Sequence, residues 1–82
     1  MEYHVYILQS ITTGRYYTGQ TYDLVKRLEE HNSELAGYTQ KEQPWKLIWS
    51  IKVATRANAV RLEKQIKARG AQRYLTDLNF GT

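Results

Sequence analysis

The sequence predicts a small α+β domain in which helices flank a three-stranded antiparallel sheet. Three stretches rich in aromatic and β-branched residues, at 3–9, 15–19 and 45–53, are typical of strands. Apolar residues at helical spacing follow the second and the third of these stretches. The order is therefore β-β-α-β-α-α. A chain of 82 residues suits one modest core, so we expect a single domain over residues 1–82, with its core within about 3–78.

The first two strands are predicted to form a hairpin. Apolar side chains occur on both alternations of residues 3–9, which indicates that both faces of the sheet are covered. Gly14 suits the turn because glycine readily adopts a positive φ, and the short connection makes the two strands antiparallel. Tyr16 and Tyr17 must face opposite sides of the sheet, and the pattern leaves open which of them faces inward.

The first helix is predicted over residues 22–31. Asp23 can cap its N-terminus, because a carboxylate at that position accepts hydrogen bonds from free backbone N–H groups. Leu24 and Leu28 are one turn apart, and we expect them to face the core with Val25 beside them.

The remaining chain predicts a polar connection, a strand and two helices. Residues 32–44 show no helical or strand period, so we expect them to be irregular. After the third strand, Thr55 can cap a helix over about 56–68 that ends at Gly70. Its expected apolar stripe is Ala59, Leu62 and Ile66. In a short final helix over 72–78, the side chains expected to point inward are Tyr74, Leu75 and Leu78.

Charge divides the chain into two unlike halves. Residues 1–45 carry four basic and six acidic side chains, whereas residues 46–82 carry eight basic and two acidic ones. A basic half suits a polyanionic partner, although a solvated helix face gives the same pattern. The absence of cysteine excludes disulfides and thiolate metal sites. No apolar run is long enough to span a membrane and the N-terminus is unlike a signal peptide, so we expect a cytoplasmic protein without a membrane contact.

Five scattered residues match the requirements of phosphodiester hydrolysis: Tyr6, Tyr17, Arg27, His31 and Glu63. A guanidinium at 27 can bind phosphate oxygens in a fork, and a histidine one turn later can donate to phosphate or shuttle a proton. The carboxylate at 63 can anchor Mg²⁺ together with waters. The phenol at 17 would activate water and the phenol at 6 would orient it.

Each residue also has an ordinary structural interpretation. Strand tyrosines commonly pack without a chemical role. Arg27 can pair with Asp23 or Glu30 at helical spacing, and Glu63 can pair with Lys67 in the favoured i,i+4 orientation.

The sequence resembles the GIY-YIG nuclease domain, whose name describes two short motifs on adjacent strands. Here these motifs read His4-Val5-Tyr6 and Tyr17-Thr18-Gly19. The resemblance extends from about Tyr3 to Leu75, and it is strongest to small stand-alone bacterial members, the YhbQ-like group. It implies a three-stranded antiparallel sheet flanked by helices.

The resemblance also implies roles for individual residues. The catalytic tyrosines of the family correspond to Tyr6 and Tyr17, its arginine to Arg27 and its metal-binding glutamate to Glu63, while His31 matches a position that holds histidine or tyrosine in active members. The implied cofactor is a single divalent ion, Mg²⁺ or Mn²⁺, with no small-molecule cofactor. The chain departs from the family at three positions: His4, Thr18 and Gln20. Asn79 is the candidate for the asparagine that active relatives often supply after the glutamate helix.

The leading expectation is therefore a metal-dependent endonuclease that hydrolyses DNA, with RNA as the other polymer, in repair or in processing of branched or single-stranded forms. The side chains expected to bind the polymer backbone are Lys46, Arg61, Lys64 and Lys67. One alternative is a nucleic-acid-binding module with little turnover, in which exposed Tyr38 and Trp45 stack on bases. Another is an interaction subunit that acts through a protein partner or as a homodimer.

Overall fold

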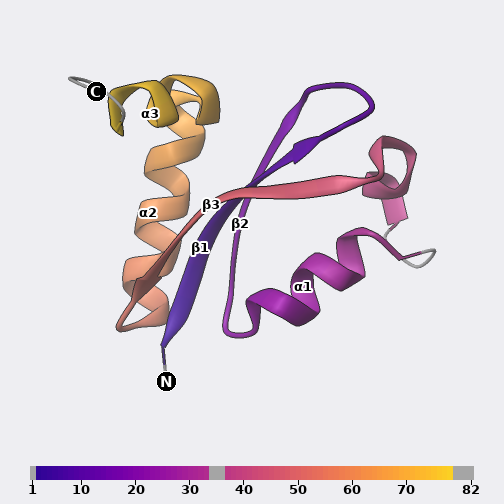
Figure 1. The fold of residues 1–82 in the computed structure, drawn as a ribbon. Coiled ribbons are helices and arrows are strands. Elements are labelled where there is room, and N and C mark those ends of the chain that lie inside the picture. The colour runs from indigo at the N-terminus through magenta and orange to yellow at the C-terminus, as the bar shows by residue number, and fades with distance from the viewer. Residues whose placement is uncertain (1, 34–36, 79–82) are drawn as a thin grey trace.

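A computed structural model describes residues 2–33 and 37–78 and confirms the predicted fold class. The elements in chain order are β1 (Tyr3–Ser10), β2 (Tyr16–Thr21), α1 (Leu24–His31), a 3-10 helix (Gly37–Glu42), β3 (Trp45–Val53), α2 (Arg56–Arg69) and α3 (Ala71–Leu78). The strands form one antiparallel sheet in the order β2-β1-β3, so β2 is an edge strand. Helix α1 lies on one side of this sheet, and α2 and α3 lie on the other (Figure 1).

The predicted helix boundaries follow from their caps. The Asp23 carboxylate accepts a hydrogen bond from the Lys26 backbone N–H at 3.1 Å, and the Thr55 hydroxyl accepts one from Asn58 at 3.1 Å. At the other end of α2, Gly70 adopts a φ of 93°, which a side chain would disfavour. The caps therefore fix where α1 and α2 begin and where α2 ends.

The core is divided between the two faces of β1, as predicted from the apolar side chains at both odd and even positions of this strand. Val5 and Ile7 point to the α2 side, where they pack with Ala59 and Ile66. The opposite face holds a second cluster whose members are Tyr6, Leu8, Trp45, Tyr17, Leu24, Leu28 and Leu47. Alternate side chains of a strand point to opposite faces, so Tyr17 shares the α1 face with Tyr6, while Tyr16 packs on the α2 face.

Four expectations about the fold are wrong. Residues 37–42 form a 3-10 helix instead of an irregular connection. Val25 is 70 % exposed, because α1 approaches the sheet only through its narrow Leu24–Leu28 stripe. Leu78 is also exposed, at the last residue of α3. Trp45 is buried instead of exposed, and its indole N–H donates to the Thr39 carbonyl at 2.9 Å.

None of the helices in the described residues combines the length and the apolar character that a membrane crossing requires.

Candidate active site

The Tyr6 side chain crosses the edge strand at a glycine. Tyr6 and Gly19 are opposite each other in the register of β1 and β2. A Cβ atom at position 19 would lie 2.6 Å from the Tyr6 hydroxyl oxygen and 2.8 Å from the ring carbon that carries it. The phenol therefore occupies the space that any side chain at 19 would need. The glycine of the second motif is explained by this contact, which lets the phenol extend over β2.

His31 lies inside the protein, in contact with both tyrosines of the motifs. Its Nε2 atom is 3.3 Å from the Tyr6 hydroxyl oxygen, and its ring centroid is 4.6 Å from that of Tyr17. Trp45 closes the same cluster, with its ring 6.0 Å from that of Tyr17 and 6.3 Å from that of His31. Tyr6 is 2 % exposed and His31 is 7 % exposed. His31 therefore contacts both tyrosines, and its burial argues against the direct contact with phosphate that the sequence predicted.

Burial also sets the protonation states of this pair. It raises the pKa of the Tyr6 phenol strongly, and the neighbouring Tyr17 adds to the effect. Burial lowers the pKa of His31 from its ordinary 6.5, and the positive charge of Arg27 lowers it further. At neutral pH the phenol therefore keeps its proton and the imidazole is uncharged. The hydroxyl can donate to Nε2 when the ring proton is on Nδ1.

The neutral imidazole makes folding stability dependent on pH. The unfolded chain takes up a proton on this histidine near pH 6.5, whereas the folded chain resists it. We therefore expect the free energy of unfolding to fall as pH is lowered below 6.5, by at most about 1.4 kcal/mol per pH unit from this group. Urea unfolding at several pH values measures the slope.

The variants that test this prediction are His31→Gln and His4→Gln. Removing His31 should flatten the slope between neutral pH and the lowered pKa. The chain has only two histidines, so His4→Gln is the matched control. A slope that survives His31→Gln and disappears in His4→Gln would contradict the assignment.

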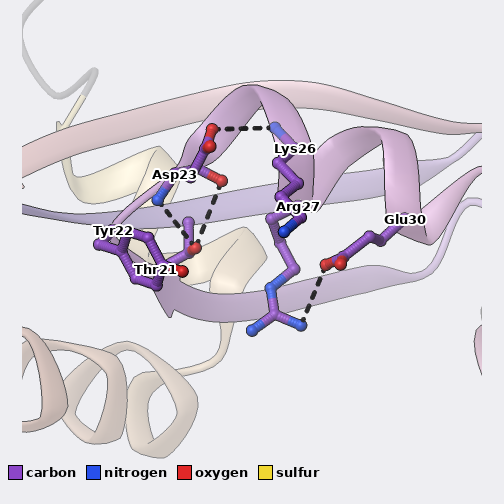
Figure 2. Close-up of a pocket in the computed structure, with 6 residues that line it drawn as sticks. All are labelled: Thr21, Tyr22, Asp23, Lys26, Arg27 and Glu30. Carbon is purple, nitrogen blue, oxygen red and sulfur yellow. Dashed lines mark hydrogen bonds and ion pairs between the residues drawn. The ribbon is translucent and has the colours of Figure 1, made fainter.

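Arg27 extends from α1 into solvent at the end of β2 (Figure 2). Its guanidinium is 3.6 Å from the Glu30 carboxylate, which is one of the two pairings that the sequence suggested. Both side chains are about half exposed, so this ion pair contributes little stability and can be exchanged for another anion at small cost. Arg27 lines a hollow of about 280 Å³ with Gln20, Tyr22 and Arg56.

Glu63 reaches the same neighbourhood from α2, on the other side of the sheet. Its negative charge raises the pKa of the Tyr6 phenol, and the positive charge of Arg27 lowers it, although both effects are smaller than that of burial. Charges from α1 and α2 therefore act on one hydroxyl group. The Glu63 side chain is 21 % exposed and forms an ion pair with Lys67, whose Nζ atom is 2.7 Å from the Glu63 Oε2 atom. This is the pairing that the i,i+4 spacing suggested.

The donor set fits a weakly held divalent ion better than a closed metal cage. Within residues 2–33 and 37–78 no three or more His, Asp or Glu side chains gather as a metal-ligand group. A single, partly exposed carboxylate matches Mg²⁺, which commonly keeps several waters and takes further oxygen ligands from a substrate phosphate. Glu63 is therefore the residue that would hold the ion, in place of its contact with Lys67.

The predicted backbone-binding residues do not all lie on one surface with this site, although Lys67 adjoins it. Lys46 lies on β3, at the opposite edge of the sheet from β2. Arg61 and Lys64 are exposed on α2, where helical spacing turns Arg61 about 160° away from Glu63. Lys67 lines a hollow with Tyr17 beside β2. Asn79 and the side chain of Tyr38 are outside the described residues.

Sequence reasoning missed Arg56 and expected Trp45 to be an exposed base-stacking residue instead of a buried part of the site. Trp45 forms a wall behind Tyr17 and His31, and Arg56 lines the hollow that contains Arg27. The sequence does contain one indication for Arg56, which directly follows the Thr55 cap. A cation at a helix N-terminus is unfavourable because it opposes the helix dipole, so its presence there suggests a role in binding an anion.

Comparisons with known proteins agree with this arrangement. The model of the GIY-YIG catalytic domain matches residues 2–75. A UPF0213 protein of Halobacterium salinarum is 36 % identical over 66 residues, covering 79 % of this chain and 84 % of the relative. A UPF0213 protein of Syntrophus aciditrophicus is 39 % identical over 66 residues, covering 78 % and 75 %.

A solved structure has the same fold. The solution NMR structure of the UPF0213 protein BH0048 from Bacillus halodurans superposes with a TM-score of 0.60 at 31 % identity, covering 99 % of this chain and 88 % of that one. The family match spans both tyrosine motifs, Arg27 and Glu63. The chain therefore belongs to the GIY-YIG family.

Proposed function

We propose that this protein is a divalent-metal-dependent endonuclease that hydrolyses phosphodiester bonds in DNA. The observation that carries the proposal is the convergence of Tyr6, Tyr17 and His31 in one cluster on β1, β2 and α1. Arg27 and Glu63 lie near enough to this cluster for their charges to affect the pKa of the Tyr6 phenol. Arg27 and Glu63 are separated in the sequence by the 3-10 helix and β3, yet both charges act on one phenol, which extends over β2. Family membership supports a nuclease activity in general terms.

The protein side chains divide the reaction between them. Arg27 binds the non-bridging oxygens of the scissile phosphate after it exchanges its contact with Glu30. Tyr17, which is partly exposed on β2, orients the attacking water and, as the phenolate, accepts the proton that the water loses when it attacks phosphorus. Tyr6 and His31 form a neutral, buried hydrogen-bonded pair that fixes the position of the Tyr17 ring. A divalent ion bound to Glu63 would offset the negative charge that develops on the leaving oxygen.

The test is cleavage by the purified protein. Supercoiled plasmid, single-stranded and branched oligonucleotides, and a matched RNA are incubated with Mg²⁺, with Mn²⁺ or with EDTA. We expect cleavage of DNA that requires the metal and returns when metal in excess of EDTA is added. Cleavage that continues in EDTA would contradict the metal dependence, and the absence of cleavage on every polymer would contradict the nuclease assignment.

The nuclease and the non-catalytic binding module differ in one measurement. A binding module would bind oligonucleotides in a filter-binding or fluorescence anisotropy assay, and the oligonucleotides would remain intact in the presence of either metal. An endonuclease produces new ends, which denaturing electrophoresis detects at one-nucleotide resolution.

A further inference from the structure

A hollow at the end of β2 combines two arginines from opposite sides of the sheet. Arg27 comes from α1 and Arg56 from the first residue of α2, and the hollow between them measures about 280 Å³. Its other lining residues are Tyr3, Gln20, Thr21 and Tyr22. None of these six carries a negative charge, and the Glu30 carboxylate that pairs with Arg27 at 3.6 Å lies outside the lining.

Arg56 is available to bind an anion. It is exposed, and within residues 2–33 and 37–78 it takes part in none of the four ion pairs. Its position in the first turn of α2 places a cation against the positive end of the helix dipole, and no acidic residue accompanies it there. An anion placed in the hollow would relieve this unfavourable arrangement.

The hollow is continuous with the proposed reaction site through Arg27. Figure 2 shows the guanidinium of Arg27 extending beyond α1 next to Glu30, and the exposed Tyr22 lines the same hollow as Arg27. Along α2, the spacing of Arg56, Glu63 and Lys67 puts the three on one side of the helix, and the helix rise separates the first from the last by about 16 Å. A strand that passes along the β2 edge would therefore meet Arg56 before or after it meets Glu63.

We propose that Arg56, with Arg27 and the Tyr22 ring as the walls, binds a phosphate of the substrate next to the scissile one. The inference rests on the proposed nuclease function for the identity of the polymer, and it adds a second phosphate position that determines where the strand lies. Arg56 acts as a binding residue for this flanking phosphate. Its guanidinium donates two parallel N–H hydrogen bonds to the phosphate oxygens, as guanidinium groups commonly do.

Binding to an intact oligonucleotide tests the proposal without relying on cleavage. The variant Glu63→Gln is used as the starting protein, so that the DNA remains whole, and Arg56→Gln is added to it. We expect the Kd for a short DNA to rise by about five- to tenfold at 0.1 M salt, and the salt slope to fall by about 0.7 to 1. Arg73→Gln, which removes an exposed charge from α3 outside the hollow, is the matched control.

A chemical change in the DNA identifies the phosphate. A neutral methylphosphonate is placed at one linkage at a time across the oligonucleotide. We expect one linkage beside the scissile position at which the methylphosphonate weakens binding to the Arg56 protein and has no further effect on the Arg56→Gln protein. Far-ultraviolet circular dichroism and thermal melting show that each variant is folded.

The outcomes separate this proposal from the proposed function. The phosphate position is overturned, even if the protein cleaves DNA, if Arg56→Gln and Arg73→Gln raise the Kd for DNA equally. It is also overturned if every methylphosphonate weakens binding to the Arg56→Gln protein as much as binding to the Arg56 protein. If the protein binds DNA through Arg56 and never cleaves, the phosphate position stands and the nuclease assignment fails. Failure to bind any oligonucleotide would overturn the phosphate position. In an active enzyme, Arg56→Gln should raise KM and leave kcat within about twofold.

Discussion

Replacing Glu63 by glutamine is expected to abolish most of the cleavage while leaving the protein folded. The substitution keeps the size of the side chain and removes the negative charge that would hold the metal in the proposed site. Loss of metal stabilisation of a leaving oxygen costs several kcal/mol, so we expect the rate to fall by about a hundredfold or more. The measurement is a single-turnover cleavage rate at saturating Mg²⁺ or Mn²⁺.

The Glu63 ion pair with Lys67 is partly exposed, so its loss should change the free energy of unfolding by less than about 1 kcal/mol. Glu29→Gln, on the exposed surface of α1, removes a carboxylate of the same type away from the site and should leave the rate unchanged. Cleavage that persists at the original rate in Glu63→Gln would indicate a contaminating nuclease or another metal site.

Gly19→Ala is expected to destabilise the fold, because the new side chain would overpack against the Tyr6 ring. The new methyl group would lie 2.6 Å from the Tyr6 hydroxyl oxygen and 2.8 Å from its ring. The ring cannot move aside easily, because it is buried and stacks on Tyr17 with 6.4 Å between centroids. Overpacking of this kind typically costs about 1–3 kcal/mol, and urea unfolding measures the change.

A double-mutant cycle tests whether this cost arises from the phenol. In a Tyr6→Leu background the clashing atoms are absent, so Gly19→Ala should then change the free energy of unfolding by less than about 0.5 kcal/mol. A similar loss in both backgrounds would show that the backbone of β2, and not the contact with Tyr6, requires glycine. Because displaced Tyr6 would also lose its hydrogen bond to His31, Gly19→Ala should reduce cleavage as well.

Local rules predicted most of the fold, because its helices and strands have strong sequence signals. Asp23 and Thr55 cap the helices as expected, and the alternation in β1 produced the two-faced core. The 3-10 helix at 37–42 escaped prediction because six residues are too few to show a period. The exposure of Val25 depends on how closely α1 approaches the sheet, which is a tertiary property that helical spacing does not contain.

The candidate site was only partly predictable, for a similar reason. Spacing on α1 placed Arg27 and His31 on one flank, but only the packing around Trp45 makes His31 an interior group and leaves Arg27 in solvent. The contribution of Arg56 depends on where the start of α2 meets the end of β2, and residues so distant in the sequence give no local signal of their proximity.

The division of the site between α1 and α2 has a consequence during translation. The tyrosines and Arg27 emerge from the ribosome well before Glu63, whose helix follows all three strands. Since α2 packs on the sheet only after the third strand has been made, a nascent polypeptide lacks the carboxylate until α2 has also been made. If the proposed chemistry holds, nucleic acids near the translating ribosome are protected from premature cutting by the order of the segments alone.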